Sequence, residues 1–95
     1  MKSYDLATML KAITYYGEKY QLDVAIEEMS ELSKEICKHN RGNSNIDNLI
    51  EEMADVYIVL KELEIILSIK EEAIDNVIAY KMDRLKDRLK DVKRL

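Results

Sequence analysis

The sequence predicts an all-α protein organised around an antiparallel helical hairpin. The 95 residues include no proline and two glycines, so few residues interrupt a helix. Apolar residues recur at helical spacing on both sides of a short polar loop, residues 41–45. A loop of this length makes the two flanking helices antiparallel neighbours. We expect residues 1–95 to form a single domain, a helical bundle whose marginal core is completed by oligomerisation.

Composition and charge exclude several classes of protein. The whole chain has a net charge of −4, which disfavours nonspecific binding to nucleic acid. Residues 81–95 are the exception, with seven Lys/Arg and three Asp. The lone Cys37 excludes an internal disulfide and suits a reducing compartment. No stretch is apolar enough to span a membrane, so we expect no membrane partner and a cytoplasmic location.

The first helix is expected to begin after Ser3, which can cap it, and to end at Gly17 after about 13 residues. Its apolar positions lie on one face and predict a buried stripe. These positions are Leu6, Met9, Leu10, Ile13 and Tyr16.

The hairpin helices should run from about Lys19 to His39 and from Asn45 to about Leu67. Gly42 is the natural turn residue between them, and Asn45 can cap the second of the two. That second helix has apolar residues outside its main stripe, and an additional apolar face needs an additional partner.

The fourth helix is expected to start at a capping box formed by Ser68 and Glu71. Its apolar residues recur at helical and near-heptad spacing, which suits packing along a bundle. They are Ile74, Val77, Ile78, Leu85, Leu89 and Val92. The apolar surface of these helices exceeds what one chain can cover, so we expect copies to associate.

Two pairs of carboxylates have i,i+3 spacing, Glu28 with Glu31 and Glu52 with Asp55. At about 100° per residue, both pairs are displaced in the same rotational sense from the apolar stripe of their helix. When the two stripes pack together in an antiparallel hairpin, such offsets place both carboxylate pairs on the same side of the two helices. The midpoint between the pairs also falls in the loop, so the pairs stand level along the helices. Glu27 points away from this groove.

Four acids in one groove repel one another unless a cation neutralises them or their pKa values rise. Carboxylate oxygens are the ligands that Mg²⁺ prefers. A single acidic pair at this spacing is usually only solvated helix surface. Two level pairs on one side of a hairpin instead predict a metal site.

The segment Glu27-Glu28-Met29-Ser30-Glu31, followed after twenty residues by Glu52-Met53-Ala54-Asp55, resembles a known signature. It is similar to the EExxE…ExxD motif of the MazG-like all-α nucleoside triphosphate pyrophosphohydrolases. The resemblance covers roughly residues 10–90. It implies a four-helix core that assembles as a homodimer or a dimer of dimers.

The resemblance also implies an activity, the Mg²⁺-dependent hydrolysis of a (d)NTP between the α and β phosphorus, with Mn²⁺ as a substitute. Either Glu28 or Glu31 would activate the attacking water, and both alternatives stay open. Lys81 and Arg84 would contact the substrate phosphates. The implied metal ligands are Glu28, Glu31, Glu52 and Asp55.

The substrate base is not indicated by the motif. Gln21 can hydrogen-bond a base edge, whereas the tyrosines at positions 15, 16 and 20 are more typical of core or rim residues. Three other interpretations remain: a helical interaction protein whose acids are only solvated, the same chemistry on phosphoribosyl-ATP, and nucleotide binding without turnover.

Overall fold

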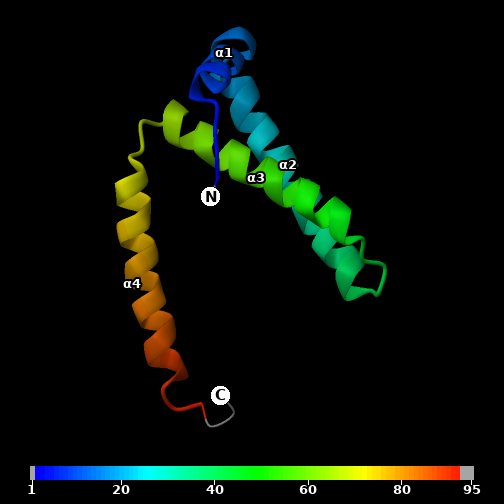
Figure 1. The fold of residues 1–95 in the computed structure, drawn as a ribbon, viewed down its shortest axis with the longest axis vertical. Helices are drawn as coiled ribbons and strands as arrows, with labels where there is room; N and C mark the ends of the chain where they lie inside the picture. Colours follow the sequence, from blue (N-terminus) through cyan, green and yellow to red (C-terminus); the bar gives the residue numbers. More distant parts are fainter. Residues whose placement is uncertain (1, 93–95) are drawn as a thin grey trace.

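The computed structural model describes residues 2–92, which form four α-helices and no strand (Figure 1). In chain order these are α1 (Leu6–Tyr16), α2 (Glu18–Asn40), α3 (Ile46–Ile66) and α4 (Glu71–Leu89). The predicted all-α fold class is confirmed. Within residues 2–92, no helix combines the length and apolar character needed to cross a lipid bilayer. Lys93 and Arg94, two of the seven Lys/Arg in residues 81–95, lie outside the described residues.

The predicted hairpin is formed by α2 and α3, which pack along each other (Figure 1). Gly42 has a φ of 84°, a backbone conformation that favours glycine, and it closes α2 by donating its N–H to the carbonyl of His39. The side chain of Asn45 accepts a hydrogen bond of 3.2 Å from the N–H of Asn48. Both the turn residue and the cap of α3 are therefore as predicted.

The buried apolar core is small and lies where α1 meets the hairpin. Gln21 and Glu62 are buried beside it, and the Gln21 amide lies 3.5 Å from the carbonyl oxygen of Ala12, to which it donates. The stripe predicted for α1 is only partly buried, because α1 covers just one end of the hairpin (Figure 1). The exposed members of that stripe are Leu6, Leu10 and Tyr16. The buried apolar residues are Met9, Ile13, Ala25 and Val59.

The cap predicted for α1 was wrong. Asp5, not Ser3, is the N-cap residue, and its carboxylate accepts from the N–H of Thr8 at 3.1 Å and from the Thr8 hydroxyl at 2.7 Å. These two hydrogen bonds lower the pKa of Asp5. The helix has 11 residues because the chain before Asp5 is extended and crosses α3.

The capping box predicted for α4 was also wrong. Ser68 has a φ of 54°, and the N–H of Ile69 donates to the carbonyl of Glu64 at 2.9 Å. This is the Schellman arrangement that ends a helix, so Ser68 belongs to the end of α3. Lys70 precedes α4, and its side chain makes no capping hydrogen bond.

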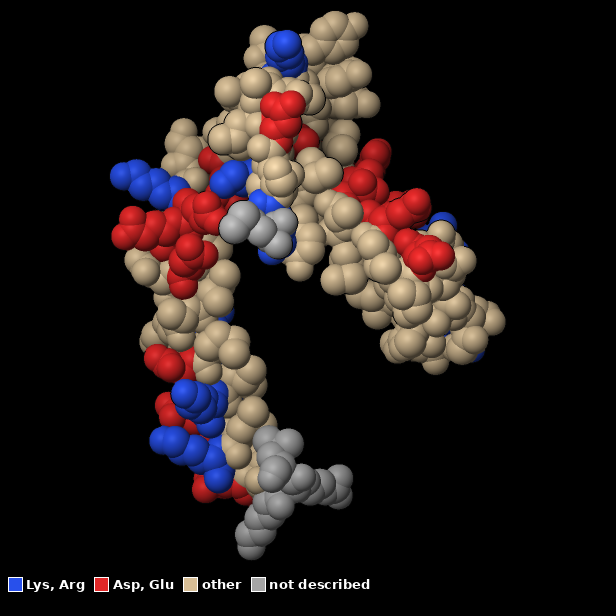
Figure 2. All heavy atoms as spheres, in the orientation of Figure 1, with Lys and Arg blue, Asp and Glu red and all other residues tan. Residues whose placement is uncertain are grey.

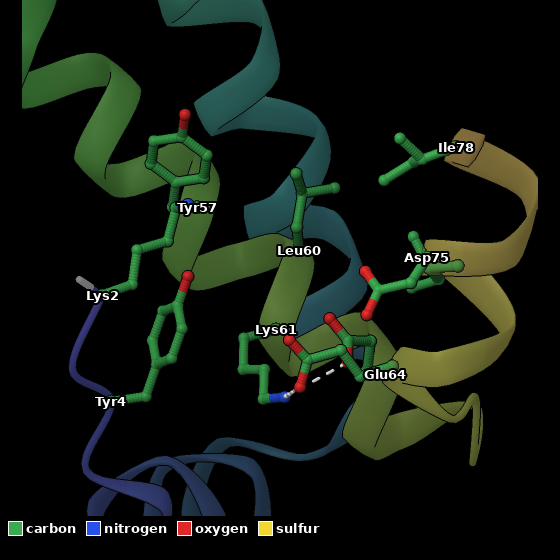
Figure 3. Close-up of a pocket in the computed structure, with 10 residues that line it drawn as sticks. Lys2, Tyr4, Tyr57, Leu60, Lys61, Glu64, Asp75 and Ile78 are labelled. Carbon is green, nitrogen blue, oxygen red and sulfur yellow. Dashed lines mark hydrogen bonds and ion pairs between the residues drawn. The ribbon is translucent and has the colours of Figure 1, made fainter. Parts of the chain in front are cut away.

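α4 stands apart from the hairpin (Figure 1), and none of its residues is buried among residues 2–92. Its first turn is tied to α3 by Lys61, whose ammonium lies 3.2 Å from Glu64 and 3.5 Å from Glu71. A recess of about 490 Å³ separates the start of α4 from α3 and the N-terminal segment (Figure 3). One chain therefore does not close a four-helix bundle, and the bundle stays a prediction.

The Schellman arrangement predicts that Ser68→Gly stabilises the protein. Glycine adopts a positive φ without the cost that serine meets, whereas it also adds entropy to the unfolded chain, which opposes folding. The net effect should raise the free energy of unfolding by about 0.5 kcal/mol. Ser44→Gly, in the hairpin loop at a position without positive φ, should not stabilise. Urea unfolding measures both. A Ser68→Gly protein of equal or lower stability would contradict this assignment.

Candidate metal centre

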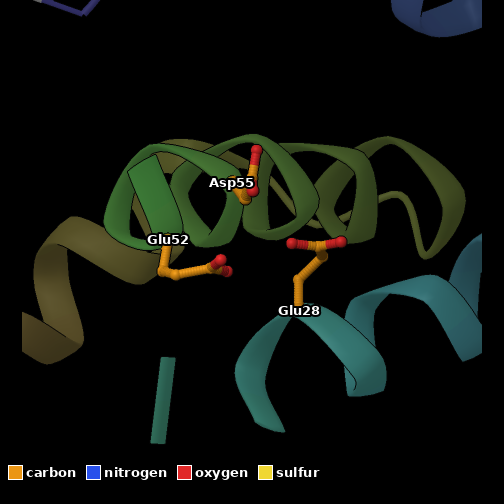
Figure 4. A group of neighbouring side chains, drawn as sticks. All are labelled: Glu28, Glu52 and Asp55. Atoms are coloured by element: carbon orange, nitrogen blue, oxygen red, sulfur yellow. The ribbon is translucent and has the colours of Figure 1, made fainter. Parts of the chain in front are cut away.

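Three carboxylates from facing helices converge in the hairpin (Figure 4). Glu28 projects from α2, and Glu52 and Asp55 lie one turn apart on α3. Each offers an oxygen, and these three oxygens lie within 4.8 Å of one another. The structure thus brings together three of the four side chains that the sequence nominated as metal ligands.

Glu31, the fourth of them, is exposed and lies beside this group rather than in it. Its negative charge still contributes to the raised pKa values of Glu28 and Glu52. Glu27 is exposed and is not part of the group, in agreement with the helical projection.

Burial and the neighbouring negative charges raise the pKa values of two carboxyl groups. For Glu28, burial is the largest cause, followed by the charge of Asp55 and a hydrogen bond with that residue. For Glu52, burial is again first, followed by the charges of Asp55 and Glu31. The folded chain therefore holds these acids where their ionised forms are disfavoured.

One carboxylate oxygen of the group is buried without a hydrogen-bond partner among the described residues. Oε2 of Glu52 is shielded from solvent and has no hydrogen-bond donor among residues 2–92. A buried carboxylate oxygen without a donor is costly, and a bound cation satisfies it as well as a hydrogen bond does. Three convergent carboxylates with such an oxygen fit a hard divalent ion such as Mg²⁺ or Mn²⁺.

Glu35 is a buried acidic residue near this group that the sequence analysis missed. It is 8% exposed, and its charge contributes to the raised pKa of Glu52. Lys38 forms an ion pair of 3.2 Å with it. The signal was available in the spacing, because Glu35 follows Glu28 by seven residues and therefore shares its face of α2.

The remaining predicted site residues lie elsewhere in the single chain. Lys81 and Arg84 are exposed on α4, where they line a small recess with Arg88, away from the carboxylates. Figure 2 shows acidic side chains gathered along the hairpin, whereas α4 carries both signs of charge. Gln21 is buried, and its amide N–H donates to the carbonyl oxygen of Ala12 on α1, so its contact with a base stays a prediction.

Comparison with known proteins gave no match. No family model, curated protein or solved structure is similar to the chain at a significant level. What the chain does has to be inferred from its own carboxylates and from the motif that carries them.

The raised pKa values predict how pH and Mg²⁺ act on stability. A raised pKa means that the folded state binds protons more tightly than the unfolded state does. The bound proton therefore stabilises the fold at low pH, and this stabilisation is lost as the pH rises through the folded pKa. Without metal, the melting temperature of the wild type should fall as the pH rises above 4.5, the ordinary pKa of a glutamate, by more than that of Glu52→Gln. Mg²⁺ should raise the wild-type value at neutral pH and have a smaller effect in acid.

Calorimetry of the wild type, Glu52→Gln and Glu27→Gln checks this. Glu27→Gln is the matched control, since it removes the same charge from an exposed position outside the group. It should respond to Mg²⁺ as the wild type does, and Glu52→Gln should not. Equal responses from all three proteins would argue against a metal at this place.

Proposed function

We propose that the chain is a MazG-like nucleoside triphosphate pyrophosphohydrolase that requires Mg²⁺. It cleaves a (d)NTP between the α and β phosphorus and releases (d)NMP and pyrophosphate. The observation that carries this proposal is the convergence of Glu28, from the first half of the motif, with Glu52 and Asp55, from the second half. Glu28 lies 24 positions before Glu52 in the sequence, and their meeting supports the metal site that the motif implies.

Each acid has a role in this proposal. Glu28, Glu52 and Asp55 would hold the ion, and when bound it would supply a Lewis acid for the substrate phosphates. Glu31 lies at the edge of the group and keeps an exposed carboxylate for orienting the attacking water and taking its proton. Glu28 is the alternative base, with Glu31 then joining the metal ligands.

Assembly of copies is the second part of the proposal, as a homodimer or a dimer of dimers. The apolar face of α4 is exposed in one chain, which is costly in water. A second copy that covers this face would close the four-helix bundle and bring a basic stretch near the carboxylates. We assign Lys81 and Arg84 to the substrate phosphates there, because Lys and Arg make strong charge-assisted contacts with them. The exposed members of the face include Ile74, Val77, Ile78, Leu85 and Leu89.

A non-catalytic helical interaction protein is the rival from another class, and the uncovered α4 favours it. It explains the apolar surface but gives no reason for three carboxylates to share one groove at the expense of stability.

We also propose a cytoplasmic location for the protein. The exposed thiol of Cys37 suits a reducing compartment.

Removal of single carboxylates should slow hydrolysis. Glu28→Gln, Glu52→Gln and Asp55→Asn should each lower kcat/KM by at least about 10- to 100-fold, because even residues that merely support metal ligands have effects of this size. Glu31→Gln should lower kcat by about 100-fold or more if it is the base. Glu27→Gln should retain activity.

The measurement is pyrophosphate release with Mg²⁺ across canonical, deoxy and modified nucleotides and phosphoribosyl-ATP. Activity on phosphoribosyl-ATP alone would keep the chemistry and change the substrate. Binding with no monophosphate formed from any substrate would identify a nucleotide-binding protein. If the protein neither binds nor hydrolyses any of these nucleotides, the interpretation as an interaction protein would be favoured.

Assembly through α4 predicts that a charge on its apolar face separates the copies. Ile78→Asp should shift the mass in light scattering toward that of one chain, 11.1 kDa. Asn76→Asp adds the same charge about 200° away around the helix and should leave the assembly intact. A wild-type protein that stays at the mass of one chain at every concentration would contradict this part of the proposal.

A further inference from the structure

A second recess lies on the other side of the N-terminal segment, between that segment, α1 and α3. Its volume is about 270 Å³. Met9, Ala12 and Ile58 give it apolar walls, and Ser3 and Tyr4 lie along the extended chain at its edge. Pockets for drug-sized ligands usually measure about 300–1,000 Å³, so this recess suits a ligand smaller than a nucleotide.

Glu62 is a buried acid in the lining of this recess. It is 8% exposed, and its Oε2 has no hydrogen-bond donor among residues 2–92. Burial raises the pKa of Glu62, because the ionised form loses its hydration. Ion pairs within a helix form at a spacing of three or four residues, and all four such neighbours of Glu62 are apolar. These neighbours are Ile58, Val59, Ile65 and Ile66.

The charged side chains that line the recess are acidic. Within the described part of the chain, the lining includes Asp5 and Glu62 but no lysine or arginine. The carboxylate of Asp5 caps α1, and its hydrogen bonds with Thr8 lower its pKa, so it is ionised at neutral pH. An unpaired carboxylate in an apolar recess is costly, and a cation that contacts it offsets this cost. The recess therefore favours a ligand with a positive charge.

The apolar walls favour an organic cation over a metal ion. Mg²⁺ and Ca²⁺ take about six or more oxygen ligands, whereas this recess offers two carboxylates, one of which already accepts from Thr8. A primary ammonium group on an alkyl stem needs one acceptor at its head and apolar surface along its stem, as a lysine side chain does. Either oxygen of Glu62 can accept from it, because the last torsion of a glutamate side chain is soft.

We propose that this recess is a binding site for a primary alkylammonium group. The ammonium donates to the carboxylate of Glu62, and the stem packs on the apolar walls. The site is separate from the carboxylate group of the candidate metal centre, which does not include Glu62, so it does not depend on the proposed hydrolysis. The ammonium group belongs either to a free amine, such as a polyamine, or to a lysine side chain of a second copy.

An NMR titration of the wild type at neutral pH tests the site with two ligands of the same shape. n-Butylammonium should shift the amide resonances of Thr8 and Ile58 with a dissociation constant of about 10 mM or lower, a modest affinity for so small a ligand. 1-Butanol is neutral and should bind at least about tenfold more weakly, because it makes no charge-assisted hydrogen bond with the carboxylate. Sodium chloride at matched ionic strength should leave these resonances unchanged.

Two variants show whether Glu62 is the residue that recognises the cation. Glu62→Gln keeps the shape and removes the charge, so it should weaken binding of n-butylammonium by about tenfold and leave that of 1-butanol unchanged. Glu51→Gln is the matched control, since Glu51 is exposed on α3 outside the recess, and it should bind as the wild type does. Equal affinities of the wild type for the two ligands would overturn the inference whether or not Glu62→Gln folds. Wild-type affinity for n-butylammonium in Glu62→Gln would overturn it too.

Light scattering identifies the source of the ammonium group. If a lysine of a second copy occupies the recess, n-butylammonium should lower the mass of the assembly relative to matched sodium chloride, and Glu62→Gln should do the same. If the ligand is a free amine, the mass should not change, and 1,4-diaminobutane should bind at least as tightly as n-butylammonium. Either result supports the site. An unchanged mass together with no shift of the Thr8 and Ile58 resonances by either amine would overturn it.

Discussion

Mutual repulsion among the carboxylates of Glu28, Glu52 and Asp55 is the constraint on which the rest of the structure depends. The packing of α2 against α3 holds them together, and the tight turn at Gly42 leaves the two helices no freedom to separate at that end. Burial first, and then the charges of the neighbouring carboxylates, raise the pKa values of Glu28 and Glu52 and disfavour their ionised forms. A fold that keeps such a group is suited to a ligand that supplies positive charge.

The chain has little apolar core with which to offset this repulsion. Its buried apolar residues lie at one end of the hairpin, and α4 contributes none of them. Two external partners would remedy the deficit: a divalent cation in the acidic groove and a second copy over the apolar face of α4. Ligand binding and assembly would then stabilise the same folded state, since each binds only to the folded chain.

Much of the hairpin could be predicted from spacing alone. The apolar period, the short loop, Gly42 and Asn45 are local signals, and they place Glu28 beside Glu52 and Asp55 without further information. The cap of α1 was missed because Ser3 and Asp5 both lie near the start of the helix, and only the path of the chain across α3 decides between them. Ser68 was misassigned because serine is uncommon at a position of positive φ. The position of α4 apart from the hairpin could not be predicted, because its apolar period indicates a packing face but not the surface that would cover it.

The most direct test of the carboxylate group is to locate the ion itself. Crystals grown with MnCl₂ would show the ion by its anomalous scattering, and Mn²⁺ accepts the same oxygen ligands as Mg²⁺. We predict an anomalous peak between the carboxylates of Glu28, Glu52 and Asp55. A peak elsewhere on the chain, or no peak at saturating Mn²⁺, would contradict the account.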